Sequence, residues 1–305
     1  MAKYEIKDGV AIIPEGTTEI EVGAFKNCAE LTNIVIPDSV TKIGIRAFSG
    51  CTGLMSIDIP NSVTEIGWYA FDGCKGLKSI VIPNSVTEIG HYAFQGCTGL
   101  TNFIIPESVK IIGLGAFSGC TGITSIVIPK SVKEIVDDAF QGCININDVM
   151  LPDSIEEIGS GAFSGCTGIT SIVIPDSVTK IDDYAFGGCV NLSNIVIPNT
   201  VTEIGSNAFK DCTSFTNILI PDSVTTIRKS SFEGCTGLTS IVIPDSVTEI
   251  EDHAFSGCRS LKKVIIPDSV TKICRYTFYG CKGLTSIVIP DSVTEIGGYA
   301  FFYCI

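Results

Sequence analysis

Cysteine is the residue whose number and spacing in this sequence most plainly suggest chemistry. Thirteen of the fourteen cysteines, from Cys28 to Cys304, follow one another at intervals of 23 residues. A regular set of thiols could form disulfides, ligate a metal ion or act as nucleophiles. Cysteines stacked in register would lie about 4.8 Å apart with parallel side chains, whereas a disulfide needs converging Cβ atoms about 3.8 Å apart. The spacing therefore argues against disulfides.

Zinc is disfavoured for a related reason. A single line of thiols cannot surround a tetrahedral ion, and the sequence has no Cys-x-x-Cys motif or histidine pair to complete a site. We predict no metal site and no cofactor. The stretch "AFSGCTG" occurs at 47–53, 116–122 and 162–168. We predict that Cys51 and its equivalents act as small apolar side chains that pack in a narrow corner of the core.

Cys274 is the one cysteine outside this pattern. It occupies the place held by Gly44, Gly67 and Gly297 in other repeats, and it lies beside Arg275. A neighbouring cation could lower the pKa of a thiol and make it reactive. Two interpretations are open: Cys274 is a candidate reactive thiol, or it is a fortuitous substitution in a turn.

No other residues form a catalytic set. His91 and His253 are the only histidines, and the repeat separates them by about 34 Å at the spacing of stacked strands, so we expect them not to share a site. A serine such as Ser62 follows most of the prolines by two residues, where its hydroxyl suits local turn backbone rather than nucleophilic attack. We predict no catalytic residues and no enzyme activity.

Acidic residues also recur in register. The residue after the proline is acidic in most repeats, Asn in three of them and Lys130 in one. Aligned like charges would attract cations or a basic partner, although Asp and Asn also simply suit the turn. Calcium could bind along such a row, but the regular coil lacks the varied oxygen ligands of a dedicated site.

The elements that position these residues come from one repeating unit. All thirteen prolines, from Pro14 to Pro290, are 23 residues apart, and no insertion interrupts the period. In "LMSIDIP" (54–60) apolar and polar residues alternate, which predicts a strand with Ile57 and Ile59 inward. The proline ends this strand, and "VTEIG" (63–67) predicts a second short strand. A unit of this size cannot bury its apolar residues alone, so we expect the units to stack as a solenoid.

The pattern "L..I.IP..V..I...AF..C" resembles the BspA-like leucine-rich repeat, also called the Treponema pallidum type. Leu54, Ile57, Pro60, Phe71 and Cys74 carry the match in one unit, and their counterparts carry it over residues 8–305. The resemblance implies a β-rich leucine-rich-repeat solenoid with a parallel sheet on its concave face and short strands and turns on the convex side. It also implies surface proteins that act in adhesion and protein binding, with no shared catalytic residues.

The organisation follows from the same period. We predict a capping β-hairpin over 1–13, around an Asp8-Gly9 turn, that merges into a single solenoid of thirteen coils over 8–305. The last coil carries no polar cap, so we expect end-to-end self-association through the C-terminal edge, or continuation of the chain.

The strongest candidate binding surface is a row of aliphatic residues on the solvent side of the first strand. Eleven of twelve repeats carry an aliphatic residue there, interrupted by Asp58. The central members are Val81, Ile104, Val127, Met150, Val173, Val196, Leu219 and Val242. Either a partner packs on this row, or strand propensity alone selected valine.

A second candidate surface precedes the Ala-Phe pair. Trp68, Tyr69, His91 and Tyr92 fall on adjacent repeats and form the sole dense aromatic patch expected outside the core. Aromatic side chains of this kind often supply most of a binding energy. The alternative is a loop that tolerates any residue.

Composition limits the partners. The net charge of −13, without any run of Lys or Arg, argues against nucleic acid, and no segment is apolar enough to span a membrane. We expect a non-catalytic protein-binding module, an adhesin on the cell surface or secreted if a leader has been removed. An intracellular scaffold or regulatory binding protein in the cytoplasm is the alternative, and the many thiols would suit that reducing compartment.

Overall fold

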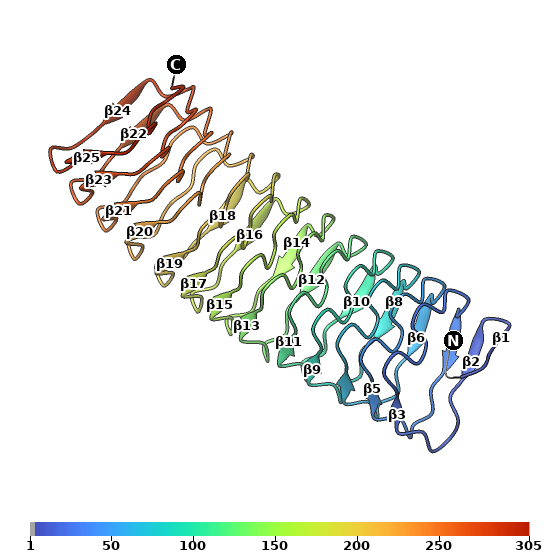
Figure 1. Ribbon diagram of the computed structural model, residues 1–305. Helices are drawn as coiled ribbons and strands as arrows, with labels where there is room; N and C mark the ends of the chain where they lie inside the picture. Colours follow the sequence, from blue (N-terminus) through green and yellow to red (C-terminus); the bar gives the residue numbers. More distant parts are fainter. Residues whose placement is uncertain (1–3, 305) are drawn as a thin grey trace. The chain divides into compact units, whose positions relative to one another are not determined.

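The computed structural model describes residues 4–304, apart from the side chain of Asn102, and is built from short strands without a helix in that range. Residues 1–3 of the predicted hairpin and Ile305 lie outside the described residues. The chain divides into two compact units, residues 1–154 and 155–305. Figure 1 shows that each unit is a stack of similar coils.

The first unit begins with a two-residue strand, β1 (Ile6–Lys7), and then alternates three-residue and two-residue strands. The three-residue strands are β2 (Val10–Ile12), β4 (Asn33–Val35), β6 (Ser56–Asp58), β8 (Ser79–Val81), β10 (Asn102–Ile104), β12 (Ser125–Val127) and β14 (Asp148–Met150). The two-residue strands are β3 (Glu19–Ile20), β5 (Lys42–Ile43), β7 (Glu65–Ile66), β9 (Glu88–Ile89), β11 (Ile111–Ile112) and β13 (Glu134–Ile135).

The second unit continues the alternation. Its three-residue strands are β16 (Ser171–Val173), β18 (Asn194–Val196), β22 (Lys263–Ile265) and β24 (Ser286–Val288). Its two-residue strands are β15 (Glu157–Ile158), β17 (Lys180–Ile181), β19 (Glu203–Ile204), β20 (Thr226–Ile227), β21 (Glu249–Ile250), β23 (Lys272–Ile273) and β25 (Glu295–Ile296). Between β18 and β22, two parallel bridges, Leu219 to Val242 and Ser240 to Lys263, hold the equivalent positions.

Strand pairing follows the period of the sequence. In the first unit β6, β8 and β10 pair parallel, with Ile57 opposite Ile80 and Ile80 opposite Phe103, and the two-residue strands β3, β5, β7, β9 and β11 pair in the same way. In the second unit β16 pairs with β18 and β22 with β24, again 23 residues apart. Every equivalent residue is therefore placed directly above its counterpart in the neighbouring coil.

The N-terminal hairpin is part of the first unit. β1 pairs antiparallel with β2, with Ile6 opposite Ala11, and β2 in turn pairs parallel with β4. Asp8 and Gly9 connect the two strands with φ of 50° and 81°. Two consecutive positive φ angles are the geometry that a two-residue hairpin turn requires, and Asp-Gly is a preferred sequence for it.

In the core of each unit, side chains at equivalent positions of successive coils stack on one another, and most positions keep one residue type. Phenylalanines of successive Ala-Phe pairs stack almost parallel: ring centroids are 5.2 Å apart for Phe71 and Phe94 in the first unit and 5.6 Å apart for Phe163 and Phe186 in the second. The predicted second strand over 63–67 is shortened to β7, but its side-chain directions hold: Val63 and Ile66 are buried while Thr64 and Glu65 between them are exposed. The predicted inward and outward positions of this strand are confirmed.

Candidate functional site

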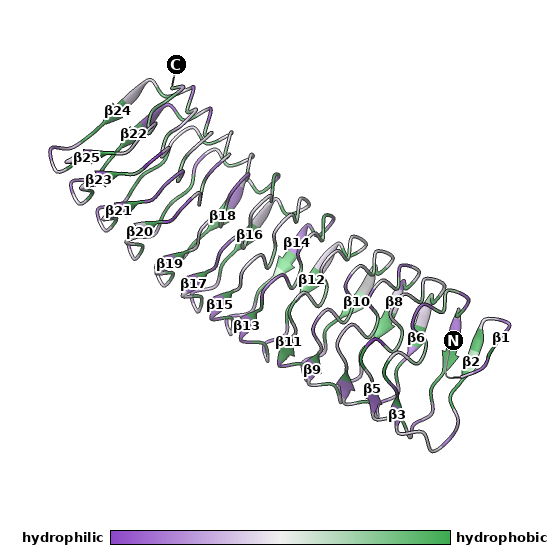
Figure 2. Ribbon diagram, in the orientation of Figure 1, coloured by the Kyte–Doolittle hydropathy of each residue, from purple (hydrophilic) through white to green (hydrophobic). Residues whose placement is uncertain are grey.

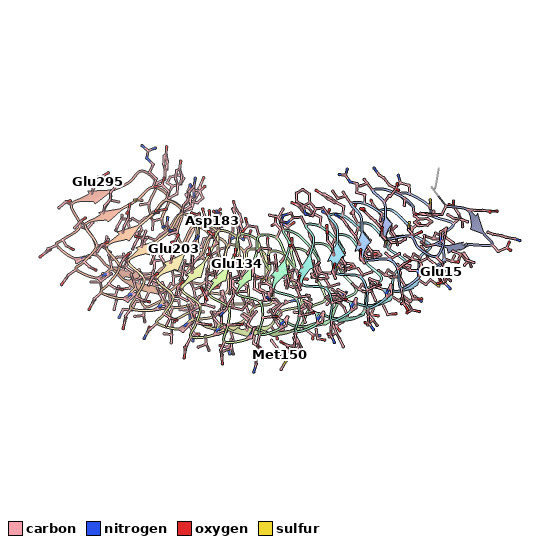
Figure 3. The ribbon with its side chains drawn as sticks, turned by 90° about the horizontal axis from the view of Figure 1, so that it is seen from below. Glu15, Glu134, Met150, Asp183, Glu203 and Glu295 are labelled. Carbon is pink, nitrogen blue, oxygen red and sulfur yellow. The ribbon has the colours of Figure 1, made fainter. Side chains whose placement is uncertain are left out.

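The exposed side of the three-residue strands carries the predicted aliphatic row. We call the residues Val35, Val81, Ile104, Val127, Met150, Val173, Val196, Leu219, Val242, Ile265 and Val288 the aliphatic stripe. Their side chains are between 49% and 80% exposed. Met150 points out from the ribbon into solvent (Figure 3). The alternation of the strand explains this exposure, because the neighbouring Ile residues of the same strands face the core.

In the first unit the stripe borders a groove of about 700 Å³. The groove is lined by Val81 and Ile104 and by Pro83, Pro106 and Asn84 of the following turns. Figure 2 shows hydrophobic residues within β8 and β14. Asp58 interrupts the stripe one coil away, directly opposite Val81 in the sheet. The fold therefore accepts a charged residue at a stripe position.

In the second unit two smaller grooves meet at Val242. One, of about 300 Å³, lies between Leu219 and Val242, and the other, of about 400 Å³, lies between Val242 and Ile265. Asp222 lines the first of these grooves and Asp245 lines the second. Stripe and turn residues thus belong to one surface, with the aliphatic side chains beside the acidic row.

The predicted aromatic patch is assembled in the first unit. The ring centroids of Trp68 and His91 are 5.0 Å apart, and those of Tyr69 and Tyr92 are 4.9 Å apart and stacked. The guanidinium of Arg46 lies 4.8 Å from the centre of the Tyr69 ring, which adds a cation–π contact. The backbone N–H of Leu114 donates a 2.8 Å hydrogen bond to Nδ1 of His91, so this imidazole has a structural partner.

The patch is not the sole dense one, and that part of the sequence prediction is wrong. In the second unit His253, Tyr276 and Tyr299 stack with centroid distances of 4.7 and 5.2 Å, and Tyr279 and Phe302 extend the group. The signal was present in the sequence. The last repeat reads "AFFYC". Most other repeats read Ala-Phe, a polar or small residue, Gly and Cys, so aromatic residues replace both residues between Phe and Cys.

Both aromatic groups include residues with left-handed backbone. The residue before the Ala-Phe pair has a positive φ wherever it is described. Tyr69, Tyr92, His253, Tyr276 and Tyr299 lie between 56° and 61°. A side chain in this region costs about 1–2 kcal/mol, and Gly115 holds the same place in another coil without that cost. The Tyr92 ring lies against Gly115, where an added Cβ atom would collide with Cε1 of Tyr92.

The cysteine row packs in the core and also makes hydrogen bonds that the sequence did not reveal. Eleven of the thiols donate to the carbonyl oxygen of a phenylalanine 26 residues earlier, in the preceding coil. The S···O distance is 3.0 Å for Cys51 and Phe25 and 3.2 Å for Cys281 and Phe255. Burial raises the pKa of Cys51 and Cys281 to about 12. These thiols therefore stay protonated and unreactive near neutrality.

Cys274 differs from that row, but not as the sequence suggested. Its side chain is half-buried in a cleft of about 300 Å³ with Asp252, Lys272, Arg275 and Glu295. Burial and the carboxylate of Asp252 raise the pKa of the Cys274 thiol, although Lys272 opposes them. Of the two open interpretations, a thiol activated by Arg275 is not supported by this pKa direction, because the acidic neighbours from the preceding coil were not visible from the local sequence.

The serines after the prolines also bond differently from the prediction. The Oγ of Ser62 donates to the carbonyl oxygen of Val40 at 2.6 Å, and Ser246 does the same to Val224 at 2.8 Å. The acceptor is in the preceding coil rather than in the local turn. Ser62 and Ser246 each therefore tie two neighbouring coils together, whereas the Oγ of the equivalent Ser177 is buried without a hydrogen-bond partner among the described residues.

Between residues 4 and 304, no three His, Cys, Asp or Glu side chains come together in a way that could hold a metal ion. The same part of the chain contains no helix that is long and apolar enough to cross a membrane.

The sequence of the chain matches a known family of repeat proteins. The model of the BspA-type leucine-rich repeat region, which spans six copies, matches residues 18–147, 89–216, 133–262 and 202–305. No curated protein is significantly similar to the chain in sequence.

Three solved structures give the likeness in detail. A leucine-rich repeat protein from Bacteroides ovatus is 34% identical, with a TM-score of 0.81, over 97% of this chain and 85% of that one. The leucine-rich repeat protein of T. pallidum is 37% identical, with a TM-score of 0.50, over 52% of this chain and 77% of that one. A leucine-rich cell surface protein from Faecalibacterium prausnitzii is 28% identical, with a TM-score of 0.52, over 91% of this chain and 86% of that one.

The coarse fold prediction is confirmed by these likenesses and by the stacked parallel strands. With its family model matched from residue 18 to residue 305, the chain belongs to the BspA-type leucine-rich-repeat proteins.

Proposed function

We propose that this chain is a non-catalytic protein-binding module whose ligands dock on the aliphatic stripe. The observation that carries the proposal is the exposure of the stripe, which is 72% for Val81 and 78% for Leu219. Exposed apolar side chains that recur on neighbouring strands of a unit are unusual on a solvent-facing sheet, and such surfaces commonly bind another protein. The grooves beside Val81 and Val242 give the stripe concave regions into which side chains of a protein ligand could fit.

The proposed setting is the cell surface, where the chain would act as an adhesin or recognition protein. The Faecalibacterium protein to which the chain is similar is described as a cell surface protein. Fourteen free thiols would ordinarily favour a reducing compartment. Burial weakens that objection, because the raised pKa of thiols such as Cys51 slows their oxidation outside the cell.

The experiment compares the wild-type chain with a stripe variant as bait. Val127→Asp and Val173→Asp place at two stripe positions the residue that Asp58 already supplies in its own coil, so the fold should persist. Ligands captured from extracellular-matrix or cytosolic extracts by the wild type should be lost with this double variant. They should be retained with Trp68→Ala, which alters only the aromatic patch. Retention by the stripe variant and loss by Trp68→Ala would move the site to the patch.

The alternative function is an intracellular scaffold, which the free thiols favour. Labelling intact source cells with an antibody against the chain separates the two settings. Labelling before permeabilisation supports the surface protein, and labelling only afterwards supports the scaffold. The stripe variant tests the binding surface in either setting.

A further inference from the structure

The second unit combines the aliphatic stripe with a row of acidic residues. The residue after the proline is Asp176, Asp222, Asp245, Asp268 or Asp291 in five coils of this unit, and all five are exposed. Asn199 holds the same place in the remaining coil. In the first unit the equivalent row is mixed, because it includes Asn61, Asn84 and Lys130. The second unit therefore presents a more uniformly negative border to whatever lies on its stripe.

These carboxylates have no partners of their own in the described part of the chain. The side chains of the five aspartates make neither an ion pair nor a hydrogen bond with any residue from 4 to 304. By contrast, charges on the two-residue strands pair with one another, as in Lys180 with Glu157 at 3.1 Å and Lys272 with Glu295 at 2.8 Å. Negative charge is thus left available beside the stripe.

The opposite border of the stripe in this unit is neutral or positive. It consists of the first residues of the strands and their equivalents, Ser171, Asn194, Ser240, Lys263 and Ser286 among them. Lys263 and Asp245 line the same groove from opposite sides of Val242 and Ile265. A complementary partner therefore needs an apolar ridge with positive charge along one flank only, the flank that faces the proline turns.

The spacing of the coils favours a helix as the form of that partner. Stacked strands are about 4.8 Å apart, while successive turns of an α-helix are about 5.4 Å apart, so a helix drifts by only about 0.6 Å per coil. An extended peptide repeats its side chains about 6.7 Å apart on one face and leaves the register within about three coils. Apolar residues at every third or fourth position of a helix can therefore follow the stripe across the second unit.

We infer that the stripe of the second unit binds an amphipathic helix of a partner protein with lysine or arginine along one flank. The apolar ridge of the helix lies on Leu219, Val242 and Ile265. The basic flank faces Asp222, Asp245 and Asp268. This inference rests on the proposed docking of proteins on the stripe and adds the chemistry of the partner.

The test uses two fluorescent synthetic helices of about 18 residues, which span about 27 Å. Both carry leucine at every third or fourth position, and one flank is lysine in the first peptide and glutamate in the second. Anisotropy titrations against the full chain at low salt should give at least a tenfold lower Kd for the lysine peptide. The preference should shrink in 0.5 M salt, because surface charges are then screened.

The charge assignment is tested with a triple variant, Asp222→Asn, Asp245→Asn and Asp268→Asn. Asn199 already holds the equivalent place, so this variant should fold as the wild type does. It should weaken binding of the lysine peptide about tenfold, since three screened charge contacts together contribute on the order of one factor of ten. A control with the same change in charge, Asp38→Asn, Glu107→Gln and Asp153→Asn in the first unit, should leave the Kd unchanged.

The outcomes separate this inference from the proposed function. Equal affinity for both peptides, or equal effects of the two triple variants, overturns the assignment of a basic partner. If both peptides bind equally but lose affinity with Leu219→Ser and Val242→Ser, docking on the stripe stands and only the charge preference is refuted. If neither peptide binds at micromolar concentration, the inference is wrong, and the bait experiment with the Val127 and Val173 variant decides the proposed function separately.

Discussion

The buried thiols predict that the fold loses stability steeply in alkaline solution. Nine of them have a pKa raised far above that of an exposed cysteine, with burial as the largest cause in each case: Cys51, Cys74, Cys97, Cys143, Cys189, Cys212, Cys235, Cys258 and Cys281. In the unfolded chain the same thiols titrate near their ordinary pKa of about 8.5. Raising the pH from 7 to 10 should therefore ionise these thiols in the unfolded chain and favour that state.

The sign follows from which state binds more protons. Because the folded-state pKa is the higher one, the contribution of each thiol to stability is complete below about pH 8.5. It declines as the pH rises above that value, and for Cys51, Cys189 and Cys281 the decline continues toward the folded-state pKa of about 12. The unfolded chain gains about 1.4 kcal/mol per thiol at pH 9.5, so nine thiols cost about 13 kcal/mol, a loss as large as the whole stability of many domains.

The assay is urea unfolding followed by far-UV circular dichroism between pH 7 and pH 10, with a phosphine reductant to keep the thiols reduced. A variant with Cys51→Ala, Cys189→Ala and Cys281→Ala is the matched control, because its tyrosines and lysines titrate as before. Its loss of stability between pH 7.5 and 9.5 should be smaller by about 4 kcal/mol, the share of three thiols. If the free energy of unfolding of the wild type stays constant up to pH 10, or falls with pH equally in the two proteins, the buried thiols are not the cause of the alkaline loss of stability.

Three further predictions follow from single contacts. In an Ellman titration of the folded chain, Cys274 and Cys304 should react before the others, because they are half-buried and the other twelve are buried, and all fourteen cysteines should react after denaturation; early reaction of more than two would mean that the core opens. Ser62→Ala should lower the free energy of unfolding by about 1 kcal/mol in urea titration, because the hydrogen bond to the preceding coil is lost; an unchanged midpoint would count against this role. Gly115→Ala should cost about 1–2 kcal/mol through its left-handed backbone and the Tyr92 ring, and the part due to the ring should disappear when Tyr92 is replaced by Ala; identical costs in both backgrounds would show that the ring does not matter.

Most of the fold could be predicted from the sequence because the period leaves little freedom. The prolines recur in all thirteen repeats, and the alternation around Ile57 and the pattern of Val63 and Ile66 recur in most of them, so one correct assignment applies throughout. The exposed positions of the stripe follow from the same alternation, since side chains of a strand point to opposite faces. Whether the stripe binds a partner stays a prediction.

The candidate site could be predicted only in part, because several contacts join residues of different coils. Arg275, the sequence neighbour of Cys274, left open a lowered thiol pKa, but burial and Asp252 from the preceding coil raise it. Ser62 was expected to bond its own turn, but its acceptor, Val40, is in the coil before it. A periodic sequence shows which residues are equivalent and does not show which of them touch.

By itself, then, the sequence determined the repeat, the parallel stacking, the inward and outward side chains and the family, because all of these depend on residue type and a fixed interval. Only the tertiary structure decided which carboxylates border the grooves, which aromatic residues stack beside Tyr276, and which carbonyl oxygens accept hydrogen bonds from the cysteine thiols. The physical reason is distance. Hydrogen bonds, ring contacts and charge effects act over a few ångströms, and stacking brings residues 22 to 26 positions apart within that range.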